Sequence, residues 1–177
     1  IILLQHPVTT QSENSKKEID KIMKAIFKLK RNTICISPNS DAGNNSIFQS
    51  LNNYSKYDFI KVYDNIPRSD YLGLLNNCGV LVGNSSSGMI EGSYFPIHVI
   101  NIGMRQENRE RGNNVTDVNG NSSKSIYLAI KYALENKNRK KFVNKFIYGK
   151  GNASKKIVKI LESIPINKKL IQKQIRF

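Results

Sequence analysis

Four polar stretches of this sequence could do chemistry: His6-Pro7, residues 38–43, residues 83–88 and residues 104–106. Each follows a short apolar run that contains β-branched residues. Such runs are typical of buried parallel strands. Because ligands of open α/β sheets bind outside the carboxyl ends of the strands, we expect the four stretches to converge on one site.

The serine run is the strongest anion-binding candidate. Ser85, Ser86 and Ser87 lie between two glycines, and the following residues 89–91 can open a helix. Free backbone N–H groups and the positive end of a helix dipole suit a phosphate. A simple helix N-cap is the alternative interpretation. Glu91 could accept from two ribose hydroxyls, or could only interact favourably with the dipole.

The other loops supply further candidates. His6 could donate a hydrogen bond to a diphosphate or to a departing oxygen, or could merely end its strand. Asn39 and Asp41 are typical turn formers, so a structural role is their alternative. Arg105 is close to a strand end, where its guanidinium suits a phosphate or a base carbonyl. The arginines at 109 and 111 are expected to pair with Glu107 and Glu110.

Strand and helix patterns alternate along the chain. Predicted strands cover residues 1–5, 33–37, 59–62, 80–82, 97–102 and 115–118, and predicted helices cover residues 12–29, 46–54, 68–78, 123–136 and 153–164. Alternation at this pace implies right-handed βαβ units, a parallel sheet and helices on both faces. The predicted fold is a doubly wound, Rossmann-like α/β domain.

The length of 177 residues favours one domain, 1–177, with a basic tail at 165–177. No apolar run approaches the roughly 20 residues that span a bilayer, so no membrane span is expected. The chain begins on an apolar strand pattern, Ile1 to Leu4, without an initiator Met or a signal peptide. We interpret it as the second half of a longer protein.

The net charge of +15 raises the possibility of a nucleic-acid partner. Its distribution argues against one: residues 1–123 carry 13 basic and 11 acidic side chains, whereas residues 124–177 carry 15 and 2. The excess belongs to residues 124–177, and an acidic partner domain is a better use for this charge. We therefore expect no specific nucleic acid as partner.

Cys35 and Cys78 stand in apolar settings without CxxC spacing, which fits buried free thiols in a reducing cytoplasm; a disulfide is the alternative. No Walker loop, GxGxxG, HExxH, GxSxG or paired Cys/His spacing occurs. Metal, NAD and ATP chemistries are therefore not expected, and no cofactor is predicted.

Five blocks of residues, in this order along the chain, resemble the hydrolysing UDP-N-acetylglucosamine 2-epimerases of sialic acid biosynthesis. They are His6 to Thr9, Pro38-Asn39 with Asp41 to Gly43, Gly83 to Ser86 with Glu91, Asn101 to Gly103 with Arg105-Gln106, and Gly149 to Ala153. The resemblance covers nearly the whole chain. Asn108 is a departure, since a Gly is common there in the family.

The resemblance implies a glycosyltransferase-B-like enzyme of two Rossmann-like domains, of which this chain is the second. It implies that Ser85 and Ser86 hold the diphosphate, that Glu91 holds the ribose and that Arg105 helps the Asn39 loop to enclose the nucleotide. His6 would lie near the departing group, and the main acid and base residues would lie on the absent first domain. The family reaction needs no metal or nicotinamide.

The expected substrate is a UDP-sugar, either UDP-N-acetylglucosamine or a 2,4-diacetamido-6-deoxy analogue, and this fragment alone is expected to be inactive. We expect the complete protein to be a cytoplasmic homo-oligomer. Two other functions remain open at this point: the donor domain of a glycosyltransferase, and a non-enzymatic basic interaction module.

Overall fold

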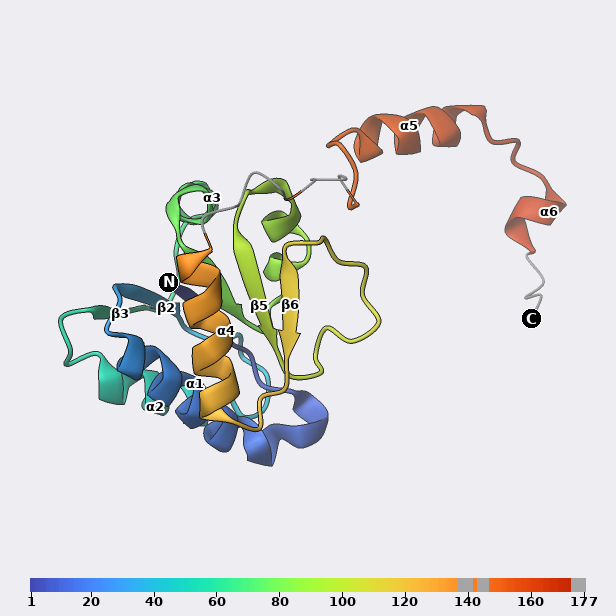
Figure 1. Ribbon diagram of the computed structural model, residues 1–177. Helices are drawn as coiled ribbons and strands as arrows, with labels where there is room; N and C mark the ends of the chain where they lie inside the picture. The colour runs from blue at the N-terminus through green and yellow to red at the C-terminus, as the bar shows by residue number, and fades with distance from the viewer. Residues whose placement is uncertain (137–141, 143–146, 173–177) are drawn as a thin grey trace. The chain divides into compact units, whose positions relative to one another are not determined.

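The computed structural model describes residues 1–136, 142 and 147–172. Contacts divide the chain into two units, Ile1–Ile147 and Tyr148–Phe177. The first unit is a parallel sheet with helices on both faces, and the second contains two helices (Figure 1). The prediction of one domain over residues 1–177 stays a prediction.

The sheet has six strands in the order β3-β2-β1-β4-β5-β6, and every neighbouring pair is parallel. The strands are β1 (Ile2–Leu4), β2 (Thr33–Ile36), β3 (Ile60–Tyr63), β4 (Val80–Gly83), β5 (His98–Ile102) and β6 (Val115–Val118). This order confirms the predicted doubly wound, Rossmann-like fold. All six predicted strands are present, with ends that differ by at most one residue.

The main core lies between the sheet and α1 (Ser15–Leu29), α2 (Asn44–Tyr54) and α4 (Ser123–Glu135). The helix α1 is amphipathic, and its apolar face packs into this core through Ile19, Ile22 and Ile26. Figure 1 shows α1 and α4 side by side against the sheet, with α2 next to α1. The 3-10 segment η1 (Thr9–Asn14), which is kinked at Gln11, precedes α1 and occupies the start of the helix predicted from residue 12.

A second, smaller core covers the opposite face of the sheet. Leu75 of α3 (Arg68–Asn77) packs there with Leu81 of β4 and Val99 of β5. Alternate residues of β4 enter the two cores, because successive side chains of a strand point to opposite faces. The helix α3 therefore lies on the face opposite to α1.

The regular α-helix expected to open at residues 89–91 does not form, and this prediction is wrong. Two short 3-10 helices, η2 (Ser86–Gly88) and η3 (Glu91–Tyr94), occupy the segment. A β-carbon on Gly88 would lie 2.8 Å from the side chain of Val99, and one on Gly92 would lie 3.1 Å from it. The segment is pressed flat against β5, and its glycines are poor helix formers.

The second unit contains α5 (Ala153–Ser163) and α6 (Lys168–Ile171). On α5 the side chains of Ile157, Ile160 and Leu161 are 55%, 58% and 67% exposed. The predicted last helix is confirmed. The last five residues of the predicted basic tail, 173–177, lie outside the described residues.

Both cysteines are free thiols, so the disulfide alternative does not hold. Cys35 is buried, and burial raises the pKa of its thiol to about 12, whereas Cys78 is half-buried. In the described part of the chain, no helix is long and apolar enough to cross a membrane.

Candidate functional site

The predicted site residues lie along the carboxyl edge of the sheet. The chain crosses from β1 to β2 in one direction and later returns to place β4 on the other side of β1. The crevice outside the carboxyl ends of β1 and β4 is therefore the topological switch point, where α/β sheets bind ligands. His6 follows β1 there, and the serine run follows β4.

Asn84 joins these two loops. Its Oδ1 accepts from the backbone N–H of His6 at 2.7 Å, and its Nδ2 donates to the His6 carbonyl at 2.8 Å. The residue is 1% exposed, so both bonds are shielded from water. This reciprocal pair fixes the His6 loop against the start of the serine run.

The loop after β5 is tied to the same residue. Gln106 Nε2 donates to the Asn84 carbonyl at 2.8 Å, and Arg105 Nη1 donates to the same oxygen at 3.3 Å. A second nitrogen of Arg105, Nη2, lies 4.0 Å from Asp41 Oδ2 in the loop after β2. Four loops, after β1, β2, β4 and β5, thus meet around Asn84.

The ring of His6 is held in one orientation. Its Nδ1 accepts from the backbone N–H of Asn39 at 3.1 Å, and Asn39 Nδ2 donates to Asp41 Oδ2 at 2.6 Å. In a neutral imidazole whose Nδ1 accepts, the proton is on Nε2. The Nε2–H group is therefore the donor that His6 can offer to a ligand.

The pKa of His6 is lowered from its ordinary value of 6.5, first by burial of the ring and second by the positive charge of Arg105. The Asp41 carboxylate opposes both effects without cancelling them. The neutral form is accordingly favoured near neutral pH.

We expect acidification below pH 6.5 to destabilise the fold through this histidine. As pH falls, the unfolded chain takes up the proton before the folded chain does. The stabilising contribution is full above the unfolded pKa and is lost as pH falls toward the folded pKa. Urea unfolding of the wild type and of His6→Asn, at several pH values from about 7.5 down to about 5, measures this loss. The variant should show a shallower loss; an identical pH dependence would contradict this role.

The serine run forms a tight turn. Ser85 Oγ accepts from the N–H of Ser87 at 3.3 Å, and the Ser85 and Ser86 carbonyls accept from Gly88 and Met89 at 3.1 and 3.0 Å. Ser85 is thus an N-cap, as the alternative interpretation held, but of a three-residue 3-10 helix. Among the hydrogen bonds of the described residues, neither the backbone N–H nor the hydroxyl of Ser86 has a protein partner. These two groups are candidate phosphate donors.

Two residues of α3 that the sequence analysis missed contact the same segment. Arg68 Nη1 lies 3.2 Å from Glu91 Oε1, and the Tyr71 hydroxyl lies 2.6 Å from Ser87 Oγ. Burial raises the pKa of Tyr71 to about 12, so the phenol remains protonated. Arg68 begins the helix that follows β3, and no candidate site residue was predicted from the sequence in the loop after that strand.

The predicted residues therefore form two groups. His6, Asn39, Asp41 and Arg105 are linked to one another and to Asn84. Ser87 and Glu91 are linked to α3 instead, and the serine turn connects the two groups along the chain. A hollow of about 300 Å³ beside Arg105 is lined by Pro7, Val8, Thr9, Thr10, Asp41, Met104 and Arg105.

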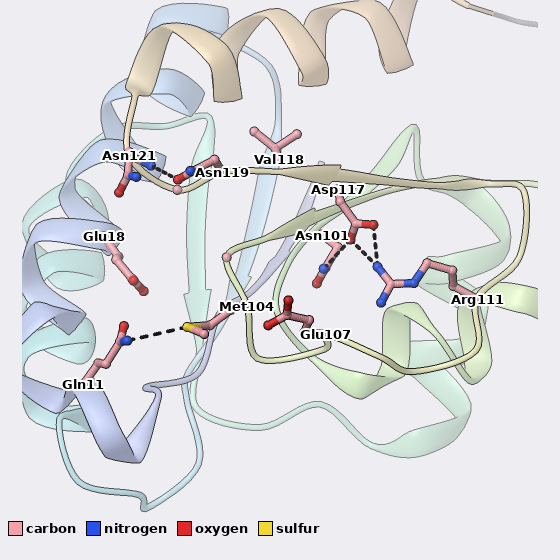
Figure 2. Close-up of a pocket in the computed structure, with 12 residues that line it drawn as sticks. Gln11, Glu18, Asn101, Met104, Glu107, Arg111, Asp117, Val118, Asn119 and Asn121 are labelled. Atoms are coloured by element: carbon pink, nitrogen blue, oxygen red, sulfur yellow. Dashed lines mark hydrogen bonds and ion pairs between the residues drawn. The ribbon is translucent and has the colours of Figure 1, made fainter.

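A larger hollow of about 630 Å³ lies at the ends of β5 and β6, and it contains none of the eight predicted residues. Figure 2 shows Glu18 and Glu107 directed into it, with Asp117 at its wall. Arg111 pairs with Asp117, a partner that the sequence did not predict. Three carboxylates against one guanidinium disfavour a diphosphate here, because like charges repel at short range.

A metal site is not formed by the described residues, since no group of three or more His, Cys, Asp or Glu side chains could hold an ion there. At Asn108 the backbone φ is 61°, in the left-handed region that favours glycine. Asn tolerates this conformation better than most residues do. The backbone geometry accounts for the departure noted at this position.

The sheet order and the polar loops at the switch point define a Rossmann-like α/β domain. Comparison with known proteins then identifies the family. The chain belongs to the UDP-N-acetylglucosamine 2-epimerase family, whose pattern matches residues 1–162.

A UDP-N,N'-diacetylbacillosamine 2-epimerase (hydrolyzing) of Legionella pneumophila is 32% identical over 172 residues, which are 97% of this chain and 45% of that protein. A UDP-N-acetylglucosamine 2-epimerase of Neisseria meningitidis is 34% identical over 132 residues, 75% of this chain and 34% of that protein. This chain thus spans less than half the length of these relatives.

A solved structure shares the fold. The UDP-GlcNAc 2-epimerase of Methanocaldococcus jannaschii, in complex with UDP-GlcNAc and UDP, superposes with a TM-score of 0.70 at 20% identity. The match covers 91% of this chain and 44% of that one. At this identity the similarity concerns the fold alone.

Proposed function

We propose that this chain is the UDP-binding domain of a hydrolysing UDP-sugar 2-epimerase and forms the second half of a two-domain enzyme. The observation that carries the proposal is the convergence of four loops on Asn84 at the switch point. The relatives named above act on UDP-N,N'-diacetylbacillosamine and UDP-N-acetylglucosamine. The proposed substrate is one of these two kinds of nucleotide sugar.

In the proposed complex the diphosphate lies against Ser85 and Ser86, where the N–H and hydroxyl of Ser86 donate to it. Glu91 accepts from the ribose hydroxyls, since an ionised carboxylate is an acceptor with several lone pairs. Arg105 and the Asn39 loop enclose the nucleotide. Arg105 brings a positive charge, and its guanidinium fork matches phosphate oxygens.

In the proposed reaction a base removes the proton on C2 of the sugar while the C1–O bond breaks. The products of this elimination are UDP and a glycal. Water then adds across the double bond, which gives the free sugar with inverted C2. The role proposed for His6 is a hydrogen bond from Nε2–H to the departing oxygen, which stabilises charge as it develops. The proton-transfer carboxylates are assigned to the absent first domain, and no metal or nicotinamide takes part.

The second unit is proposed to dock on the partner domain in the complete protein. Residues 148–177 carry 8 basic and 1 acidic side chains, and α5 exposes Ile157, Ile160 and Leu161. An exposed apolar stripe beside clustered positive charge is suited to docking on an acidic partner domain. A homo-oligomeric, cytoplasmic enzyme remains our expectation for the complete protein.

We expect calorimetry to detect UDP binding by the 177-residue chain. Glu91→Ala should weaken it by about tenfold or more, because a hydrogen bond to a charged group contributes about 1.5–3 kcal/mol. Ser86→Ala should weaken it less, by about two- to tenfold, because a neutral bond is lost. Ser55→Ala is the matched control. The Ser55 hydroxyl donates to the backbone carbonyl of Asn52 at the end of α2, and Ser55 is not one of the predicted site residues. Wild-type affinity in both site variants would count against the proposal.

The reaction is tested on the complete protein with UDP-N-acetylglucosamine or its diacetamido analogue and no acceptor. A hydrolysing epimerase releases UDP and a free 2-acetamido sugar of inverted C2. A donor-binding glycosyltransferase would leave the sugar bound to UDP until an acceptor is added, and that result would contradict the proposed reaction.

A further inference from the structure

The first turn of α3 is attached to the proposed nucleotide segment at two points. Arg68 pairs with Glu91 at 3.2 Å, and Tyr71 bonds Ser87 at 2.6 Å. Residues three apart lie on the same face of a helix, so both contacts come from one side of α3. The half-buried Tyr71 fixes the position of this turn relative to the serine run.

The two partners of the ion pair differ in exposure. The side chain of Arg68 is 74% exposed, whereas that of Glu91 is 21% exposed. The guanidinium has five N–H donors, and only one nitrogen, Nη1, is engaged by Glu91. Among the described residues, no other hydrogen bond of the Arg68 guanidinium is recorded, so its remaining donors are available to a ligand.

We propose that Arg68 reads the nucleobase, by donating a hydrogen bond to an exocyclic carbonyl oxygen of the base. The inference rests on the proposed function, in which Glu91 accepts from the ribose hydroxyls. The base is bonded to the ribose carbon next to the 2′-hydroxyl. A group paired with the same carboxylate that binds this hydroxyl is brought close to the base side of the ribose.

The chemistry of the side chain sets the direction of the preference. A guanidinium carries donors and no acceptor, so it can only recognise acceptor atoms. Uracil presents two exocyclic carbonyl oxygens, which accept, whereas the exocyclic group of adenine is an amino group, which donates, and its acceptors are ring nitrogens. Arg68 should therefore favour UDP over ADP, although both nucleotides offer the same ribose and diphosphate.

A purely structural ion pair is the competing explanation. Exposed pairs of this kind contribute little to stability. A structural or general electrostatic role would change the affinity for UDP and for ADP by the same factor. The ratio of the two affinities therefore separates the explanations.

The test is calorimetry with UDP and with ADP at one fixed ionic strength. The variants are Arg68→Ala, Arg68→Lys and Glu91→Ala, and Arg31→Ala is the charge-matched control. Arg31 is an exposed arginine just before the amino end of β2, at the opposite edge of the sheet. Melting temperatures of all variants show whether the fold is retained.

We expect the wild type to prefer UDP, and Arg68→Ala to lower the UDP/ADP affinity ratio by about tenfold, the equivalent of one charge-assisted hydrogen bond. Arg68→Lys should restore part of the ratio, because it keeps the charge and loses the planar fork. Glu91→Ala should weaken both nucleotides, and Arg31→Ala neither.

An equal loss of UDP and ADP affinity in Arg68→Ala would overturn the inference, as would a wild type that binds both nucleotides equally. Either result would contradict the recognition of the base by Arg68, but not the proposed binding of UDP by the wild type at this site. A wild type that binds neither nucleotide would instead contradict the proposed function, and the inference with it.

Discussion

Replacement of Asn84 by alanine should lower the free energy of unfolding by about 2–4 kcal/mol and abolish UDP binding. The substitution removes both side-chain partners of the His6 backbone, one acceptor and one donor. Each backbone group left unpaired away from water costs about 1–3 kcal/mol. With the bonds gone, the His6 loop is no longer fixed to the serine turn, so the site loses its geometry as well.

Urea unfolding measures the stability loss, and calorimetry measures the binding. Asn77→Ala is the matched control, because the Asn77 side chain also donates to a backbone carbonyl, that of Gly73, but is exposed to water. Its cost should stay below about 1 kcal/mol. If the two variants unfolded at the same urea concentration, Asn84 would not be the residue that joins the loops.

Gly83→Ala should have the largest effect on the fold. Gly83 ends β4 with φ of 130°, and it pairs with Leu4 of β1. A β-carbon there would lie 2.1 Å from the carbonyl oxygen of Leu4 and 2.6 Å from its carbonyl carbon. Neither backbone can move aside without opening the sheet at the switch point.

Backbone strain and overpacking together should cost about 3–5 kcal/mol, a large part of the stability of an ordinary domain. Gly73→Ala supplies the control, because no atom lies within 4 Å of its added β-carbon in the middle of α3. It should stabilise the helix by about 0.5–1 kcal/mol. Thermal unfolding of the two variants measures the difference. A Gly83→Ala variant as stable as wild type would contradict the close approach of β1 and β4.

The sheet could be predicted because its strands are short apolar runs with turn-forming residues after them. Val80-Leu81-Val82 is such a run, and the structure makes it a central strand. The rule that parallel strands end at one edge then places His6 and Arg105 near each other, although 99 positions separate them in the sequence. Periodicity and topology were sufficient for this part of the site.

The failures have a common cause, since each depends on a contact between distant segments. Residues 89–91 do not start a helix because the flanking glycines pack on Val99, which no local pattern reveals. Asn84 was read as part of a serine loop, although its reciprocal bonds join residues 78 positions apart. The Arg68–Glu91 pair was missed because the loop after β3 was given no role.

The central claim is that UDP binds at the carboxyl ends of β1 and β4, against the serine turn. The most direct measurement is a UDP titration of the wild-type chain followed through its backbone amide resonances. We expect the largest shifts at Ser85, Ser86 and Ser87, with smaller shifts at His6 and Arg105. Shifts confined to the acidic hollow at the ends of β5 and β6, around Glu18 and Glu107, or no shifts at all, would contradict it.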